Sequence, residues 1–578
     1  MRRKIFDMLV VIGLVLLIVV SWTPLQATAP ETETTAPAVT RYEAGYRYDQ
    51  YGWTFLHIEG EPYTRGYQHG YLLADQLAEV VRYNEGLSMW ETGQDWQYFV
   101  DEAERQFVRR LDEEYLEEIK GIADGAQAAG TEITWQQVLA WNGANDLEAW
   151  YPLAEEGNSP AGNGHCSAFA ATGTATAGGK IVIAHNSWDS YTRAGLDYVL
   201  LDIVPSAGHR VFMQSSPGLI DSGTDYFVND AGLMGTETTI ACFSAYDANG
   251  APEFFRARKA MQYAETADEF VEIMLVDNNG GYANSWLLGD AKTGEIVRFE
   301  LGLKYHSVSK LDDGYFIGFN GVYDSRIRNL ECDYGDSFSD VRTQVGARRV
   351  RLTQLMEENL GNIDVDAAKR ILADTYDVYL DLPNHPSAHT VDGHYELDPR
   401  NYFSYPGWWP LPYQPEGALD GKVMDSEMAA DLAFWTRTGG PGGIPFDADA
   451  FLAEHPQWDQ YRDFLPSRPS EPWALFAAGA EAAAEISVSP LEQMRNALYG
   501  EWATPEEGLF ASVEFRQDGS VLLGAAGQTI EANWHLSDPR TLAITAATGS
   551  YLEFGVLLED GNLVVSRDDV ISTFTRAG

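Results

Sequence analysis

Cys166 is the residue around which the sequence suggests chemistry. It stands in the stretch HCSAFAATGTATAGGKIVIAHNSWDSY, directly after His165, and a second polar group, HNSWD, begins at residue 185. A cysteine in such a setting is an inert buried thiol, a metal ligand or a nucleophile. Each role requires different neighbours, so the elements that position Cys166 decide between them.

The number and spacing of the cysteines restrict these roles. The chain of 578 residues has 3 cysteines, at positions 166, 242 and 332, and none lies in a CxxC or Cys/His arrangement typical of zinc sites. At least one thiol therefore stays unpaired. We expect no metal and no cofactor, which leaves Cys166 as an inert buried thiol, one partner of a disulfide or a catalytic nucleophile.

The stretch itself predicts a β-hairpin. CSAFAA and KIVIAHN have the character of two strands joined through the turn TGTATAGG. If they pair, the end of the second strand, from Asn186 to Tyr191, lies beside Cys166 at the start of the first. Polar neighbours suit a reactive thiol better than an inert one. Spacing alone leaves open the alternative that Cys166 is a small core residue.

Helical and β-rich segments alternate around this hairpin. Residues 64–150 have helical periodicity, and Thr134 with Gln137 matches a capping box. Short β-type runs separated by turns extend from Cys166 to Thr239. These runs predict a series of hairpins that follows a helical region.

The alternation continues toward the C-terminus. A helix is predicted over 252–276, with Thr266 and Glu269 placed for a second capping box. Two further hairpins follow, NSWLLGDAKTGEIVRFEL and YHSVSKLDDGYFIGFN, and then helices near 341–375. This order favours an α+β fold, with antiparallel sheets sandwiched between helices, over a doubly wound parallel sheet.

The first residues have the pattern of an export signal. Residues 1–29 contain a basic start, an apolar stretch over 8–20 and a small-residue ATA end. This segment is either a cleaved signal peptide or a retained membrane anchor. Both place the rest of the protein outside the cytoplasm, as a secreted, periplasmic or outer-surface protein. Residues 30–40 form a Thr/Pro-rich spacer.

Composition changes divide the rest of the chain. Aromatic and proline residues over 380–470 suggest an irregular wrap over the core. The final segment has short alternating strands and Asp-Gly turns, and resembles a lipocalin-like barrel. We expect a mainly helical N-terminal fragment, a catalytic core that includes the wrap, an Ala-rich connector and a β-barrel accessory module, over residues 41–165, 166–470, 471–488 and 489–578.

Charge excludes one class of partner. Lys and Arg number 39 against 86 Asp and Glu, a formal net charge of -47. Such a charge repels polyanions at long range, so we exclude nucleic acid as a partner. The acidic residues are spread along the chain, which is typical of a solubilising surface.

Five motifs resemble, in this order, those of the phospholipase B-like proteins: HCSAF, AHNSWDSY, SSPGLIDSGTDYF, GLMGTETT and NNGGYANSW. The similarity continues weakly through DVRTQVGARRVRL and GALDGKVMDS and covers about residues 60–470. GEPYTRGYQHGYLL and the cysteine hairpin are more distantly similar to isopenicillin N acyltransferase-like acylases. Both families are N-terminal-nucleophile hydrolases.

This resemblance implies a four-layer αββα fold and a precursor that cuts its own His165–Cys166 bond. Cys166 then begins a new chain, and its free α-amine, with a pKa of about 7.7, can take the thiol proton. Attack on an ester or amide gives a thioester acyl-enzyme that water resolves. His165 is the residue before the cut and assists self-cleavage rather than turnover.

The motif positions imply further site residues. Asn284 is the expected oxyanion donor, although it also suits a turn, and Thr238 can hydrogen-bond near the amine, although a strand threonine is often structural. Asp189 lies where the distant acylases hold the amine with a carboxylate, but phospholipase B-like members often have Asn or Ser there.

Substrate contacts are expected on the same hairpin. Asn186, Trp188 and Tyr191 are predicted to shape the substrate pocket. A phosphate head group could meet an arginine, and the sequence does not choose among Arg193, Arg298 and Arg342.

The sequence therefore predicts an exported, autoprocessing cysteine hydrolase of phospholipase B-like type, acting on fatty-acyl esters of phospholipids or lysophospholipids. Two alternatives stay open: an N-acyl amide hydrolase or acyltransferase of the same fold, and a non-catalytic surface lipid-binding protein. The expected partner is a lipid or acyl small molecule, and the N-terminal apolar segment, if it is retained, attaches the protein to a membrane. The sequence does not predict an oligomeric state.

Overall fold

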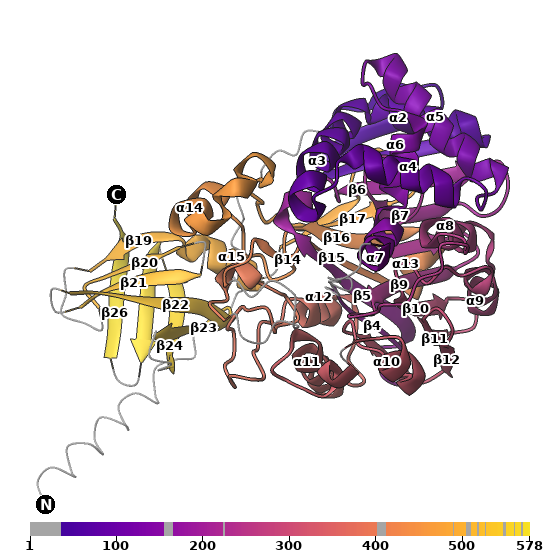
Figure 1. Ribbon diagram of the computed structural model, residues 1–578. Coiled ribbons are helices and arrows are strands. Elements are labelled where there is room, and N and C mark those ends of the chain that lie inside the picture. The colour runs from indigo at the N-terminus through magenta and orange to yellow at the C-terminus, as the bar shows by residue number, and fades with distance from the viewer. Residues whose placement is uncertain are drawn as a thin grey trace, which may run out of the picture. The chain divides into compact units, whose positions relative to one another are not determined.

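The computed structural model places the main body of the chain and most of the C-terminal module (Figure 1). It describes residues 36–154, 166–223, 226–333, 335–400, 412–488, 490–504, 510–516, 519–525, 528–546, 551–559, 561–567 and 570–577. The predicted signal or anchor, most of the spacer, and His165 lie outside these residues. Within the described part of the chain, no helix is long and apolar enough to cross a membrane.

One sheet has ten strands and begins near the N-terminus. In spatial order they are β1 (Thr40–Tyr42), β2 (Gly45–Gln50), β3 (Trp53–Gly60), β6 (Val199–Pro205), β7 (Val211–Ser215), β8 (Tyr226–Asn229), β9 (Leu233–Thr239), β10 (Asn284–Asp290), β11 (Glu295–Leu301) and β12 (His306–Leu311). Neighbours run antiparallel except for the parallel pair β3 and β6. The N-terminal segment that we expected to be mainly helical therefore also supplies three strands.

A second sheet has eight strands and contains Cys166. Its members are β13 (Gly314–Gly318), β4 (Cys166–Gly173), β5 (Gly179–Ser190), β15 (Asp420–Asp425), β16 (Ala433–Thr438), β17 (Trp473–Ala477) and β18 (Glu485–Ser487), with β14 (Glu416–Ala418) paired to β5. The expectation of an irregular wrap and an Ala-rich connector is therefore wrong at β14 to β18. These short apolar runs pair with distant strands, and neighbouring prolines and alanines obscure their pattern.

The predicted hairpins have different outcomes. β4 and β5 pair as expected, with Cys166 opposite Ser187, and so do β10 and β11. The expected hairpin of β12 and β13 is wrong, because β12 pairs with β11 and β13 pairs with β4. Gly314 takes a φ of 125°, a conformation that favours glycine, where the chain passes from one sheet to the other.

The helices predicted in the N-terminal part of the chain are found. Six follow β3: α2 (Pro62–Leu72), α3 (Ala74–Thr92), α4 (Trp96–Phe107), α5 (Glu113–Ala129), α6 (Trp135–Asn142) and α7 (Ala144–Ala154). The capping box of Thr134 and Gln137 is confirmed. The helix predicted over 252–276 is divided into α8 (Glu253–Tyr263) and α9 (Ala267–Leu275), because Ala264 is extended.

The second capping box is incomplete. Thr266 caps α9 and accepts from the backbone of Glu269, but the Glu269 side chain accepts from Glu265 N at 2.7 Å. The other helical segments described before residue 489 are α10 (Ser325–Leu330), α11 (Gln344–Glu358), α12 (Val365–Leu372), α13 (Ser426–Ala430), α14 (Ala448–Glu454), η1 (Tyr191–Arg193), η2 (Gly335–Phe338), η3 (Tyr395–Leu397) and η4 (Pro456–Phe464).

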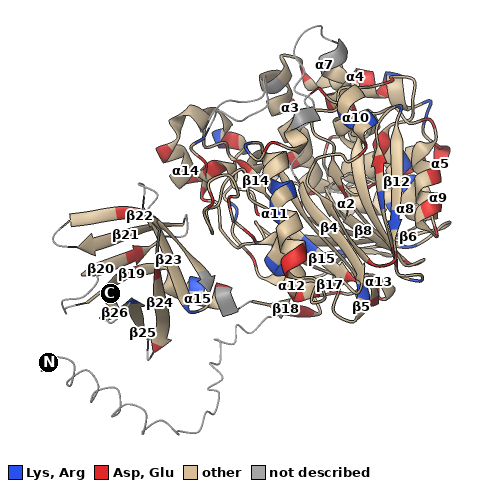
Figure 2. Ribbon diagram, turned by 90° about the horizontal axis from the view of Figure 1, so that it is seen from below, with Lys and Arg blue, Asp and Glu red and all other residues tan. Residues whose placement is uncertain are grey.

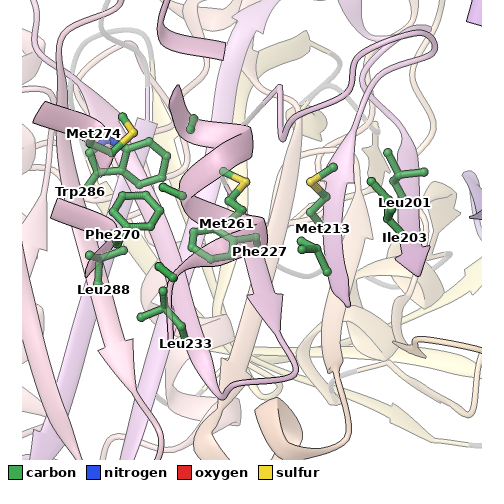
Figure 3. Packing of buried hydrophobic residues seen from close by; sticks show 14 of the residues in the cluster. Leu201, Ile203, Met213, Phe227, Leu233, Met261, Phe270, Met274, Trp286 and Leu288 are labelled. Carbon is green, nitrogen blue, oxygen red and sulfur yellow. The ribbon is translucent and has the colours of Figure 1, made fainter. Parts of the chain in front are cut away.

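Three hydrophobic clusters show how the two sheets pack against each other and against the helices. One takes side chains from both sheets, including Phe212 and Phe434, so the sheets face each other. A second joins the ten-stranded sheet to α8 and α9, where Phe270 packs on Phe227 and Trp286 (Figure 3). A third joins the eight-stranded sheet to α11 and α12. Each sheet thus packs one face on the other sheet and the opposite face on helices.

The predicted C-terminal barrel is confirmed. After α15 (Pro490–Leu498), a closed barrel is formed by β19 (Gly500–Ala503), β20 (Ser512–Phe515), β21 (Ser520–Ala525), β22 (Gln528–Asp538), β23 (Thr541–Ala546), β24 (Tyr551–Glu559), β25 (Asn562–Arg567) and β26 (Val570–Arg576). Pairing of β19 with β26 closes it. It has a hydrophobic cluster of its own, with large aromatic members such as Trp502 and Trp534. An eight-stranded barrel has room for such side chains inside.

Acidic residues occur throughout the described chain. Figure 2 shows Asp and Glu on helices such as α5, α9 and α14 and on barrel strands, rather than in one segment. This distribution agrees with the expectation of a generally acidic, solubilising surface.

Candidate active site

Cys166 is the first residue of β4 and lies between the sheets. Along β4, Ala168 and Ala170 belong to the cluster between the sheets, whereas Phe169 and Ala171 face the helical side. Side chains alternate along a strand, so Cys166 shares the face of Ala168. Its exposed fraction is 7%, and its thiol is free. The thiol is therefore held at the end of the core between the two sheets.

Two buried side chains hold the backbone of Cys166. The Cys166 N–H donates to Asn320 Oδ1 at 2.8 Å, and the guanidinium of Arg348 donates to the Cys166 carbonyl oxygen. Arg348 Nη2 also donates to Asn320 Oδ1 at 2.8 Å, and Asn320 Nδ2 donates to Thr239 O at 2.9 Å. The donor and the acceptor of Cys166 are thus both fixed by one connected network.

The sequence interpretation missed both of these residues. Asn320 lies two residues after the end of β13, in what we expected to be a hairpin, and takes a φ of 62°. Arg348 stands among several arginines in DVRTQVGARRVRL. The buried face of α11 includes Val345, Arg348 and Leu352. In the sequence, Arg348 stands at helical spacing from apolar residues, and a charged residue on an apolar helix face indicates a buried partner.

The surroundings of the Cys166 thiol oppose its ionisation in the intact chain. Burial and the Glu237 carboxylate raise the pKa of the thiol well above its usual range, against the effects of the Trp188 backbone N–H, Lys422 and Arg348. The intact chain therefore holds Cys166 as a neutral thiol at neutral pH. A nearby base is needed to make it a nucleophile.

Asn284 lies at the start of β10, opposite Thr239. Its amide nitrogen lies 3.4 Å from Glu253 Oε1, and the opposite amide orientation places the nitrogen 3.0 Å from Glu237 Oε2. Tyr282 donates to the other oxygen of Glu237 at 3.1 Å. The structure thus brings Asn284 to two buried carboxylates, one of which acts electrostatically on the thiol.

Thr238 lies between the sheets, against β13. A Cβ added at Gly318 would lie 2.7 Å from Thr238 Cγ2 and 3.2 Å from Ala168 Cβ. Thr238 Oγ1 is buried and makes no hydrogen bond with any described residue. Thr238 therefore packs at the close approach of the two sheets, on the same face of β4 as Cys166.

Asn186 and Trp188 lie on the opposite face of the hairpin from the thiol. Asn186 Oδ1 accepts from Ser167 N at 2.8 Å and from Trp188 Nε1 at 3.1 Å. Asn186 Nδ2 donates to Val391 O at 2.9 Å, and Arg348 stacks 4.3 Å from the centre of the Trp188 ring. These contacts support the start of β4 from the side of α11. Their predicted role in a substrate pocket stays a prediction.

Asp189 and Tyr191 continue the chain beyond the thiol. Asp189 Oδ2 lies 3.4 Å from Arg193 Nε, and its side chain keeps 42% of its surface exposed. Partial burial and the Asp197 carboxylate raise the pKa of Asp189 to about 6, against the effect of Arg193. Tyr191 is buried in a separate cluster, with the Phe446 ring 4.6 Å away. The Cys166 N–H donates to Asn320 Oδ1, and the roles predicted for Asp189 and Tyr191 stay predictions.

The three arginines considered for a phosphate group each lie beside a carboxylate. Arg193 lies 3.3 Å from Asp197, Arg298 3.8 Å from Glu300, and Arg342 2.6 Å from Asp340. The structure therefore does not single out any of them as a phosphate ligand.

Comparison with known proteins points to one family. A family model described as Phospholipase B matches residues 94–302. A phospholipase B of Crotalus adamanteus is 26% identical over 310 residues, which are 49% of this chain and 53% of that protein. The chain is related to the phospholipase B-like family. Putative phospholipase B-like 1 of Caenorhabditis elegans is 23% identical over 465 residues, which are 70% of this chain and 81% of that protein.

The phospholipase B match covers one part of the site. Its range includes Cys166, Glu237 and Asn284 and ends before Asn320 and Arg348. An uncharacterized protein of Archaeoglobus fulgidus is 26% identical over 252 residues, which are 41% of each chain. The alignments thus span only 41% and 53% of the lengths of the archaeal and snake relatives. The resemblance expected from the five motifs is confirmed.

Proposed function

We propose that this phospholipase B-like chain is an exported, autoprocessing cysteine hydrolase that cleaves fatty-acyl esters of phospholipids or lysophospholipids. The observation that carries the proposal is the position of Cys166, at the head of β4, with its N–H held by Asn320 and its carbonyl by Arg348. The names of the relatives add the substrate class. Two facing sheets with helices on their outer faces support an αββα N-terminal-nucleophile fold.

Self-cleavage would begin at the thiol of Cys166. Sγ attacks the carbonyl carbon of His165, the peptide C–N bond breaks, and the nitrogen of Cys166 takes a proton and becomes an amine. The resulting thioester joins the His165 carbonyl to Sγ, and water hydrolyses it to release the thiol. Asn320 Oδ1 already accepts from this nitrogen in the intact chain, so it is placed to hold the amine after the cut.

Turnover would use the new amine as the base. With a pKa of about 7.7, it is partly unprotonated at neutral pH and can take the thiol proton. The thiolate then attacks the acyl carbonyl, an alcohol leaves, and water resolves the thioester. Asn284 is our choice for the oxyanion donor, because it supplies a neutral amide N–H that one buried carboxylate orients, Glu253 in one amide orientation or Glu237 in the other. In this mechanism Asn320, rather than Asp189, orients the amine.

The test joins sequencing of fragments with product analysis. The purified full-length protein is sequenced from its N-termini and incubated with phosphatidylcholine, lysophosphatidylcholine and N-acyl amino acids, with products identified by mass spectrometry. We expect one fragment that starts at Cys166 and fatty acid from the phospholipids. Fatty acid from the amides alone would replace the ester proposal with the amide hydrolase. An uncut chain with Cys166 internal, and no hydrolysis of either kind, would favour the non-catalytic alternative.

The same sequencing tests export. An N-terminus beyond residue 29 in protein recovered from the culture medium or periplasm is expected for a cleaved signal. Full-length protein that stays in the cytoplasm would contradict the export part of the proposal.

A further inference from the structure

A completely buried lysine lies on the strand next to the cysteine hairpin. Lys422 on β15 donates to Asp420 Oδ2 at 2.8 Å and to Ser187 Oγ at 2.7 Å. Asp420 Oδ1 accepts from Ser187 N at 2.9 Å. All three residues are buried. An ammonium away from water is costly unless it is paired, and here a carboxylate on the same strand pairs it and fixes its direction.

This ammonium points toward the neighbourhood of the nucleophile. Lys422 is opposite His185 on β5, and its Nζ reaches along the sheet to Ser187, the residue directly opposite Cys166. Residues opposite each other in an antiparallel pair have Cβ atoms about 5 Å apart and side chains on one face. Lys422 therefore reaches a side chain adjacent to Cys166, on the face that looks toward the ten-stranded sheet.

The other charged groups near the thiol have different positions. Glu237 on β9 disfavours the thiolate, and Arg348 on α11 favours it but is engaged with the Cys166 carbonyl and Asn320. Burial and Lys422 lower the pKa of His185 on β5 well below its usual range, so that imidazole is neutral. Lys422 is thus a cation on the same face of the eight-stranded sheet as the thiol, and its effect on the pKa of the thiol is opposite to that of Glu237.

We propose that Lys422, anchored by Asp420, is a positioning residue for Cys166: it stabilises the thiolate and holds the Ser187 hydroxyl beside it. The proton of the thiol goes to the α-amine, which becomes an ammonium, and Lys422 takes no part in the proton transfer. This inference rests on the proposed function, since it needs Cys166 to act as the nucleophile. It adds a residue from GALDGKVMDS to the chemistry of the cysteine hairpin.

The test measures thiolate formation rather than turnover. Iodoacetamide labels the full-length protein across the neutral to alkaline range, and mass spectrometry follows the Cys166 peptide. An opposite charge nearby typically changes the pKa of a group by about one or more, so Lys422→Met should slow labelling at neutral pH by about tenfold and move its midpoint to higher pH. Lys422→Arg keeps the charge and should restore most of the labelling.

Lys369 offers a matched control. It is also a buried lysine, but its Nζ lies over the Trp435 ring at 3.5 Å, among side chains that pack on the helical side of the same sheet. Lys369→Met removes the same charge and should leave the labelling profile of Cys166 unchanged. Ser187→Ala, a small change, should move the midpoint in the same direction as Lys422→Met, and it provides the test if that variant does not fold.

The outcomes separate this inference from the proposed function. A wild-type Cys166 that labels, together with unchanged profiles in folded Lys422→Met and Ser187→Ala proteins, overturns the role of Lys422 alone. An equal change of the profile in Lys369→Met also overturns it, because the effect would then be general. A wild-type Cys166 that neither labels nor starts a fragment overturns both proposals.

Discussion

Arg348 Nη2 and Asn320 Oδ1 lie 2.8 Å apart, and each residue also contacts the backbone of Cys166. Arg348 comes from the first half of α11 and Asn320 from the segment just after β13, and the two meet only in the folded chain. Through them the peptide groups on both sides of the Cys166 side chain are held in one orientation. The proposed cut therefore depends on this network and on the core around it.

Substitution of Cys166 separates self-cleavage from external proteolysis. Cys166→Ala removes the nucleophile, so we expect one uncut chain and no hydrolysis. Cys166→Ser retains a hydroxyl that can make the same acyl shift, so we expect slow cutting. N-terminal sequencing and denaturing electrophoresis follow the cut over time. If Cys166→Ala still yields two fragments, another protease makes the cut and the proposed mechanism is wrong.

Asn320→Ala should block cutting and destabilise the protein. The change removes the acceptor of the Cys166 N–H and one acceptor of Arg348 in a buried setting. Each unmet buried donor costs about 1 to 3 kcal/mol, so thermal or denaturant unfolding should show a clear loss. The fraction of cut chain, measured at a temperature where the variant is folded, reports the positioning role.

A second buried asparagine serves as the control for that loss. Asn229 at the end of β8 donates to Met261 O at 3.0 Å and Ala264 O at 2.9 Å, contacts that join the sheet to α8. Asn229→Ala should lower stability by a similar amount and leave the cut intact. If both variants cut alike, Asn320 does not orient Cys166 for the reaction.

Local patterns in the sequence predicted the local elements. The capping box of Thr134 and Gln137 and the hairpin that begins at Cys166 depend on residues close in sequence, and both are found. The closed barrel follows from regular short strands and turns. Apart from the pairing of β19 with β26 that closes the barrel, the partners are near neighbours along the chain, so their spacing in the sequence predicts them.

The pairing of segments far apart in the sequence could not be predicted from local spacing. β13 follows β12 closely but pairs with β4 in the other sheet, because burial rather than proximity decides its partner. The contacts of Asn320 and Arg348 with Cys166 depend on that pairing and on the packing of α11, so the sequence did not predict them. Tyr191 belongs to a core cluster of its own region, and its predicted role in the substrate pocket stays a prediction.

Asp221 should make stability depend on pH in the acid to neutral range. Burial raises the pKa of this carboxyl from 3.8 to about 7. The folded chain therefore binds the proton more tightly than the unfolded chain. The resulting stabilisation is fully present below pH 3.8 and is lost as the pH rises through about 7.

Asp221→Asn replaces the protonated acid with a neutral side chain of similar shape. Denaturant unfolding at a series of pH values should give the wild type and the variant similar stability in acid. Above neutral pH the variant should be more stable by a few kcal/mol, since each tenfold difference in proton affinity between the folded and unfolded chains corresponds to about 1.4 kcal/mol. A difference between the two proteins that does not change with pH would show that Asp221 does not titrate between the folded and unfolded states as described.

Gly318 allows the close approach of the two sheets, so Gly318→Ala should destabilise the core at the site. The added Cβ would lie 2.7 Å from Thr238 Cγ2, with Ala168 close behind it. Overpacking of this kind costs about 1 to 3 kcal/mol. Thr238→Ala removes the methyl and a hydroxyl that makes no hydrogen bond with any described residue, so by itself it should cost little beyond the buried methyl.

The two changes should compensate when combined. Gly318→Ala with Thr238→Ala places a methyl where one was removed, so the double variant should be more stable than the sum of the single changes by about 0.5 kcal/mol or more. Denaturant unfolding of the four proteins gives this coupling directly. Cutting at Cys166 provides a second measure, because Ala168 joins Gly318 to the strand that carries the nucleophile. Strict additivity would mean that Gly318 and Thr238 do not share the space described here, and that the sheets can separate without cost.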